Sequence, residues 1–114
     1  MPNTLKSILT EYVKGILDIV GDNLDKVILF GSYVKNNQNS NGEISDIDIM
    51  ILVNIDEENI KNLETKILDY SYDMDLKHNI LLSPIVETVN NYNNRIKYMP
   101  FYQNVEKEGV ILSA

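Results

Sequence analysis

The first twenty residues alternate apolar and polar positions with the three- and four-residue spacing of an amphipathic helix. Thr4 precedes the pattern and Gly21 follows it, and these residue types favour the beginning and the end of a helix. The pattern predicts a helix over residues 4–20, whose buried side is formed by Leu5, Ile8, Leu9, Tyr12, Val13, Ile16, Leu17 and Val20.

Two short apolar runs further along the chain have the character of buried strands. The first covers residues 26–30 and leads directly into Gly31-Ser32, and the second covers residues 46–54. Between them lies an Asn-rich stretch, 36–42, which we expect to be a solvated loop.

The remaining pattern completes an alternation of helices and strands. We expect a helix capped by Asp56, a strand over 79–86, a polar segment over 88–95 that is irregular or weakly helical, a short helix over 101–107 and an edge strand over 110–112. The second helix would bury Ile60, Leu63, Ile67, Tyr70 and Met74. Pro84 fits the third strand only where its missing N–H is not needed in the sheet. This order predicts an α+β fold, an α/β sandwich in which a small mixed sheet is flanked by helices.

Composition narrows the class of protein. A chain of 114 residues is long enough for one packed core, and we expect a single domain over 1–114. It has no cysteine, no basic segment leading into a secretory signal and no apolar run of the roughly 18–20 residues needed to span a membrane, so we expect a cytoplasmic protein. The net charge of −7 argues against binding long nucleic acid through its phosphates and is compatible with a basic protein partner.

The strongest candidate chemistry is the run Ser45-Asp46-Ile47-Asp48, thirteen residues after Ser32. Carboxylates at positions i and i+2 of a strand project from the same face, roughly 6–7 Å apart. Two anions beside an apolar run need a compensating cation, and a pair of aspartates with room for water and phosphate oxygens suits Mg²⁺. A Gly-Ser turn that leaves a strand offers backbone N–H groups and a hydroxyl to a phosphate. The pattern therefore predicts a triphosphate site beside a metal site.

These motifs resemble the signature of the DNA polymerase beta-like nucleotidyltransferase superfamily, over roughly residues 24–86. The size is similar to that of its minimal bacterial members, which often act as the antitoxin against a helical, HEPN-type toxin. Two departures from the family pattern are visible: the Asn-rich loop is a few residues longer than usual, and the Arg and Gly common there in relatives have no obvious counterpart other than Lys35 and Gly42. The resemblance implies the nucleotidyltransferase fold, Mg²⁺ at Asp46 and Asp48, and contacts to a nucleotide such as ATP from Gly31, Ser32, Lys35 and Ser45.

The resemblance also implies a third carboxylate near the start of the strand over 79–86. The residue at that place is Asn79, which is not an acid, and Asp73 and Asp75 lie just before it. Either Asp75 completes a catalytic triad with Asp46 and Asp48, or the triad is reduced to a pair.

Two functions follow from these alternatives. The first is an enzyme that moves AMP from ATP onto a hydroxyl of a partner protein, such as a toxin encoded nearby. The second is a catalytically degenerate antitoxin that acts by binding its partner. The sequence leaves the acceptor, the nucleotide preference and a homo-oligomeric state open.

Overall fold

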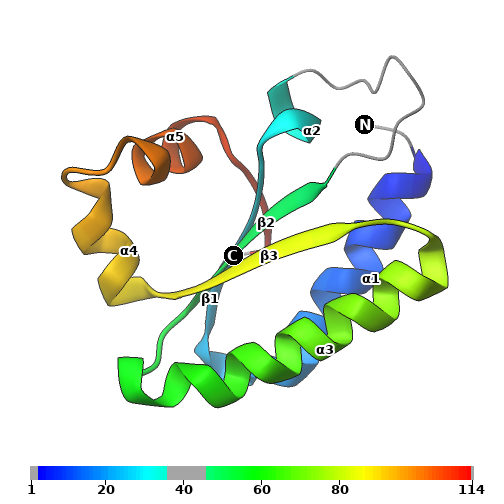
Figure 1. The fold of residues 1–114 in the computed structure, drawn as a ribbon, viewed down its shortest axis with the longest axis horizontal. Coiled ribbons are helices and arrows are strands. Elements are labelled where there is room, and N and C mark those ends of the chain that lie inside the picture. Colours follow the sequence, from blue (N-terminus) through cyan, green and yellow to red (C-terminus); the bar gives the residue numbers. More distant parts are fainter. Residues whose placement is uncertain (1–2, 36–45, 114) are drawn as a thin grey trace.

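The computed structural model describes residues 3–35 and 46–113. They form four strands and five α-helices in the order shown in Figure 1. The elements are α1 (Asn3–Val20), β1 (Leu24–Phe30), α2 (Ser32–Lys35), β2 (Ile47–Val53), α3 (Ile60–His78), β3 (Leu82–Thr88), α4 (Val89–Ile96), α5 (Pro100–Glu108) and β4 (Val110–Ser113), with two short 3₁₀ turns at Gly21–Asn23 and Glu57–Asn59.

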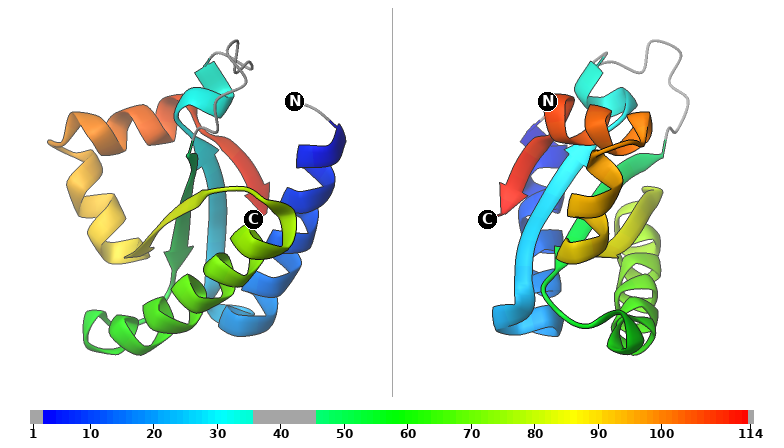
Figure 2. Two further views of the ribbon diagram at one scale, coloured as in Figure 1. Left: turned by 45° about the vertical axis from the view of Figure 1, so that its right-hand side comes forward. Right: turned by 90° about the vertical axis from the view of Figure 1, so that its left-hand side faces the viewer.

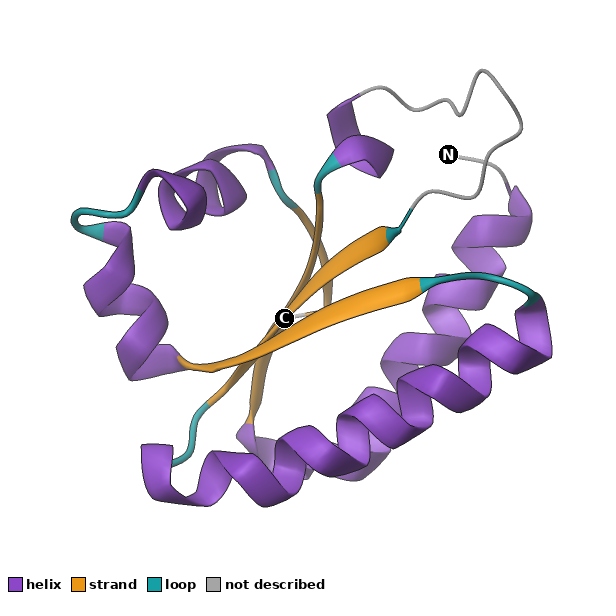
Figure 3. Cartoon of the chain, in the orientation of Figure 1, coloured by secondary structure: helices purple, strands orange, loops and turns teal. Residues whose placement is uncertain are grey.

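The strands form one mixed sheet in the order β3-β2-β1-β4. β2 and β3 are parallel, whereas β1 is antiparallel to both of its neighbours, β2 and β4. The twisted sheet lies between α1 and α3 on one side and α4 and α5 on the other (Figures 2 and 3). This architecture confirms the predicted α+β sandwich with a mixed sheet.

Side-chain alternation along β2 divides the interior into two cores. Ile47, Ile49, Ile51 and Val53 pack in the cluster that contains the buried faces of α1 and α3. Met50 and Leu52 point the other way, into a smaller cluster with Tyr92 of α4 and Tyr102 of α5. Because successive strand residues face opposite sides, Asp48 belongs to the side that carries α5.

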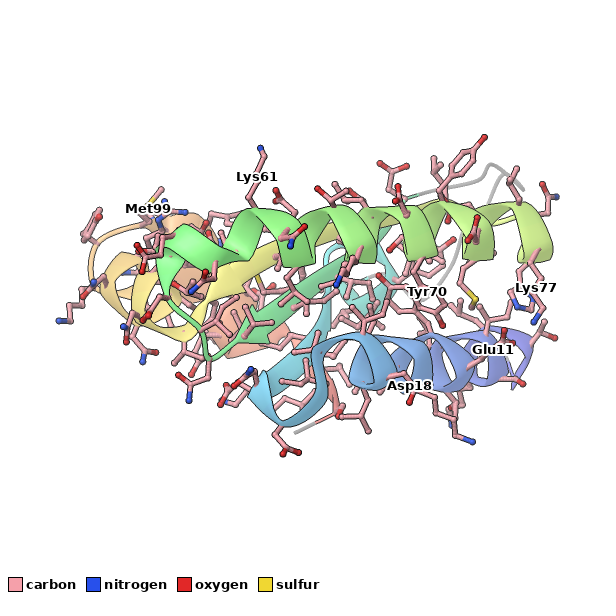
Figure 4. All side chains as sticks on the ribbon, turned by 90° about the horizontal axis from the view of Figure 1, so that it is seen from below. Glu11, Asp18, Lys61, Tyr70, Lys77 and Met99 are labelled. Carbon is pink, nitrogen blue, oxygen red and sulfur yellow. The ribbon has the colours of Figure 1, made fainter. Side chains whose placement is uncertain are left out.

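The first two long helices are joined through an aromatic contact. The rings of Tyr12 and Tyr70 stack with their centroids 5.4 Å apart, and the Tyr70 hydroxyl donates to the carbonyl oxygens of Glu11 and Tyr12 at 3.2 and 3.3 Å. Tyr70 lies so close to Gly15 that its ring occupies the position where a Cβ would be. Figure 4 shows Tyr70 between the helices and Lys77 beside Glu11, with which Lys77 forms an ion pair of 2.7 Å.

The predicted elements are found with shifted boundaries. The third strand begins at Leu82 and not at 79, because Asn79 has a left-handed backbone (φ 54°) and ends α3. Asp56 makes no side-chain capping bond, and a 3₁₀ turn separates it from α3. The polar segment after β3 is the regular helix α4, capped by the Thr88 hydroxyl, which accepts from the N–H of Asn91 at 3.1 Å.

Other features follow the prediction more closely. The helices α1 and α5 and the edge strand β4 lie where expected, and Pro84 lies in β3, an outer strand of the sheet. The Asn-rich stretch 36–42 lies outside the described residues. No helix in the described part of the chain is long and apolar enough to cross a membrane.

Candidate functional site

The Gly-Ser turn and the second aspartate of the Asp-x-Asp motif meet at one end of the sheet. Phe30, the last residue of β1, is directly opposite Asp48 in β2, so Gly31 lies next to that aspartate. Gly31 has φ +79°, a conformation that side chains with a Cβ rarely adopt. A Cβ added there would overlap Oδ2 of Asp48 and lie 3.1 Å from its Cγ. The Asp48 carboxylate therefore fills the space that the glycine leaves open.

Among the described residues, the groups that act on the Asp48 carboxylate all disfavour its charge. Asp48 is half-buried, and Asp46, which immediately precedes β2, is exposed. Burial raises the pKa of Asp48 above its usual value, and the negative charge of Asp46 raises this pKa further. Two neighbouring carboxylates offer the oxygen donors that a hard divalent cation prefers. The donor set thus fits Mg²⁺.

The third position of the site is not an acid on β3. Asp48 is paired with Ser83 in the parallel register of β2 and β3. Asp75, at the end of α3, accepts a hydrogen bond from the N–H of Leu82 on its Oδ1 at 2.8 Å and so anchors the start of β3. Within residues 3–35 and 46–113, no group of three or more His, Cys, Asp or Glu residues is arranged to hold a metal. The catalytic role of Asp75 remains a prediction.

The other residues assigned from the sequence are described only in part. Ser32 is exposed and begins α2, directly after Gly31. Of Lys35 only its position as the last residue of α2 is described, and Ser45 lies outside the described residues. The structure therefore brings together Gly31, Ser32 and the aspartate pair at one end of β1 and β2.

A cavity of about 240 Å³ opens beside this end of the sheet, between β1 and α5. α5 ends next to the turn between β1 and α2, as both views of Figure 2 show. The cavity is lined by Phe30, Gly31, Asp48, Phe101, Asn104, Val105 and Glu108. The residues from α5 were missed in the sequence because no motif marks them and more than fifty residues separate them from Asp48.

A buried polar cluster fixes α5 over the sheet. Glu87, at the end of β3, is only 7 % exposed and accepts hydrogen bonds from Nη1 of Arg95, at 2.5 Å, and from the Tyr102 hydroxyl. Arg95 also donates to the Tyr102 hydroxyl at 2.9 Å. The cluster pairs the charge of a buried carboxylate and ties α4 and α5 to β3. It thereby holds the α5 wall of the cavity in place.

Comparison with known proteins agrees with this geometry. Residues 11–112 match the family described as "Polymerase beta, Nucleotidyltransferase". Two proteins of Methanocaldococcus jannaschii are similar over nearly their whole length. "Putative protein adenylyltransferase MJ0141" is 39 % identical over 103 residues, covering 90 % of this chain and 93 % of the relative. "Putative protein adenylyltransferase MJ0604" is 33 % identical over 104 residues, covering 91 % and 93 %.

Two solved structures share the fold at low sequence identity. One is titled as a mutant of the toxin-antitoxin MntA-HpeT and the other as a toxin-antitoxin with AMP-PNP. Both have a TM-score of 0.57 and cover 92 % of this chain and 73 % of the matched chain, with identities of 17 % and 19 %. The family match and the two relatives identify the chain as a member of the polymerase beta nucleotidyltransferase family.

Proposed function

We propose that this protein transfers AMP from ATP, with Mg²⁺, onto a hydroxyl of a partner protein, and that the partner is a cytoplasmic toxin which it neutralises. The observation that carries the proposal is the contact between Gly31 and Asp48, which puts a half-buried carboxylate against the turn expected to hold phosphate. Two relatives named as protein adenylyltransferases support the reaction class. The toxin-antitoxin titles of the structural neighbours support the kind of partner.

The proposed roles follow from the position and chemistry of each group. Asp46 and Asp48 would hold Mg²⁺, which when bound would neutralise triphosphate charge and favour attack by a hydroxyl on the α-phosphorus. As the new P–O bond forms, the bond to the bridging oxygen would break, pyrophosphate would leave and the hydroxyl proton would pass to solvent. Gly31 and Ser32 would hold phosphate oxygens through backbone N–H groups and the serine hydroxyl. Lys35 and Ser45 are proposed as further nucleotide contacts. Asp75 is proposed to orient the acceptor hydroxyl.

The outer face of α3 supports a protein partner. Leu68, Tyr72 and Leu76 follow one another at four-residue spacing, so they form one stripe on the helix. They are 46, 63 and 67 % exposed, which is unusual for three large apolar side chains in a row. We call these three residues the α3 stripe. Leu81, 46 % exposed, lies close to Asp46, because its carbonyl oxygen accepts from the N–H of Ile47 at 2.8 Å.

The charges around the α3 stripe indicate the chemistry of the partner. Successive residues of an α-helix are rotated by about 100° around its axis. Asp69 and Asp73 therefore lie on one side of the α3 stripe, and Glu64 lies on the other. An apolar stripe between carboxylates fits a partner surface with an apolar centre and a basic rim.

One observation favours an alternative, namely neutralisation by binding without catalysis. The residue opposite Asp48 on β3 is Ser83, so this place offers a hydroxyl and no negative charge. If a third carboxylate is needed and Asp75 does not supply it, transfer is slow. Ser83→Asp should then increase transfer, whereas Asp75→Asn should leave it unchanged. If Asp75 is the third carboxylate, Asp75→Asn abolishes transfer.

The proposal is tested by co-expressing the protein with the product of the neighbouring gene and incubating the purified complex with Mg²⁺ and ATP. Intact mass spectrometry should show the partner heavier by one or more adenylyl groups. Asp48→Asn should prevent this gain, and Lys66→Ala, on α3 away from the site, should not. A stable complex of unchanged mass would support the binding alternative. Transfer to a small molecule with no complex would contradict the proposal of a protein partner.

A further inference from the structure

We infer that the cavity between β1 and α5 receives the base of the nucleotide, with Phe101 as the stacking surface and Asn104 as the group that hydrogen-bonds the base edge. The inference rests on the proposed function, since it assumes that a nucleotide binds at the aspartate pair. It goes further by naming the part of the nucleotide that each wall of the site contacts.

The position and the volume of the cavity both suit a single ring system such as a nucleotide base. The cavity shares Gly31 and Asp48 with the predicted triphosphate site, so a ligand held there by its phosphates would have its remaining atoms within reach of α5. Its volume of about 240 Å³ is below the roughly 300–1,000 Å³ of pockets that enclose whole drug-sized ligands. The cavity therefore fits a base better than it fits an entire nucleotide.

The walls contain an aromatic surface that is already in place. Phe30 and Phe101 meet edge to face, with centroids 5.6 Å apart and planes 83° apart. Phe101 also meets Tyr102 edge to face at 5.2 Å, and the Tyr102 hydroxyl is held by Glu87. Even so, Phe101 is 44 % exposed. A fixed but exposed aromatic ring is the usual surface on which proteins stack a base.

The polar groups of the cavity separate the base from the phosphates. Phe101, Asn104 and Glu108 follow one another at three- and four-residue spacing and so lie on one face of α5. The Asn104 side chain lines the cavity and makes no hydrogen bond to any other described residue. Its amide offers both donors and an acceptor, as a base edge requires. Glu108, the next residue along this face, is an acid, and its negative charge repels phosphate.

The alternative occupant is the acceptor side chain of the partner, because a tyrosine would also fit an aromatic cavity. The observations favour the base. The amide of Asn104, which makes no hydrogen bond to another described residue, matches the paired donors and acceptors of a base edge, whereas a tyrosine presents one hydroxyl.

The test compares two ligands that share their phosphates and differ in having a base. Calorimetric titration with Mg-ATP and with Mg-tripolyphosphate is made on the wild type, Phe101→Ala, Phe101→Trp and Asn104→Ala. Tyr98→Ala serves as the control, since Tyr98 is 69 % exposed and does not line the cavity. Thermal melting of each variant confirms that it folds.

We expect Phe101→Ala to weaken Mg-ATP binding by about 5- to 150-fold, the range measured for loss of one stacked base. Binding of Mg-tripolyphosphate should be unchanged, Phe101→Trp should retain ATP binding, and Tyr98→Ala should bind both ligands as the wild type does. Asn104→Ala should weaken ATP binding and leave tripolyphosphate binding unchanged.

Three results would overturn the inference, each in a distinguishable way. Equal weakening of both ligands in a folded Phe101→Ala protein would show that the residue supports the phosphate site and not the base. Unchanged ATP affinity with loss of transfer to the partner would assign the cavity to the acceptor. Binding of neither ligand by the wild type would refute the proposed function itself, and the base pocket with it.

Discussion

Replacing Gly31 with alanine should separate the cost of backbone strain from the cost of moving Asp48. The chain contains a matched control, because Gly21 has φ +69° and an added Cβ there would meet nothing within 4 Å. Both substitutions force alanine into a left-handed conformation, at a cost of roughly 1–2 kcal/mol. Only the alanine at position 31 would overlap the Asp48 carboxylate. To restore an ordinary van der Waals separation, that carboxylate or the turn must move by about 1 Å.

The two variants should therefore be similar in stability and different in function. We expect the melting temperature of each to fall by roughly 4–16 °C, since the strain costs about 1–2 kcal/mol and 1 kcal/mol corresponds to about 4–8 °C in a domain of about 100 residues. Gly31→Ala should also lose Mg-ATP affinity and about 100-fold in transfer rate, the order expected for a 1 Å displacement of a catalytic group. Thermal melting and calorimetric titration measure both quantities. If Gly31→Ala binds Mg-ATP as tightly as Gly21→Ala, the close contact with Asp48 has no functional role.

Four further results are expected. In the presence of a chelator, Asp48→Asn should raise the melting temperature, because burial and the neighbouring Asp46 both disfavour the charged form; a lower melting temperature would contradict this. Burial raises the pKa of Tyr12 in the folded protein to about 12. As the pH rises from about 10 to 12 the unfolded chain therefore loses the Tyr12 proton before the folded protein does, so the free energy of unfolding should fall. In Tyr12→Phe this fall should be less steep. Tyr102→Phe removes the hydroxyl that donates to a buried carboxylate and should cost about 1–3 kcal/mol in denaturant unfolding, and a neutral result would show that the cluster does not anchor α5. Tyr72→Asp should weaken the complex with the partner in a pull-down and leave Mg-ATP titration unchanged, whereas loss of both would show general damage.

The fold was predicted best where the hydrophobic periodicity and the local residue types indicate the same element. The amphipathic spacing of residues 4–20 and the apolar run after Asp48 correspond closely to α1 and β2, because α1 buries one regular face and β2 is buried on both. The exception is Leu17, which was predicted on the buried side of the first helix and is 49 % exposed. The third strand was predicted to begin too early, since Ile80 and Leu81 continue its apolar run backwards along the chain. In the structure the N–H of Ile80 is instead bonded to the carbonyl of Asp75, closing α3, so local pairing overrides the apolar pattern.

The site could be predicted only in part for a similar reason. Gly31 and Asp48 belong to short motifs whose chemistry is visible in the sequence, and their contact follows from the pairing of two neighbouring strands. The α5 wall arises from tertiary packing, in which a buried glutamate on β3 selects the position of a later helix. No spacing in the sequence encodes such a contact, so Phe101 and Asn104 carried no recognisable signal.

The tight fit of Tyr70 against Gly15 has a consequence for engineering this protein. Exchanging a glycine in the middle of a helix for alanine normally stabilises a protein by about 0.5–1 kcal/mol, so a propensity-based design would select position 15 first. Here a methyl group would have to displace an aromatic ring that also stacks on Tyr12 and bonds the α1 backbone. The contact also prevents α1 from sliding along α3, because the Tyr70 ring fits only beside Gly15. Helix-optimised variants of this chain should therefore keep Gly15 and Tyr70 as a pair.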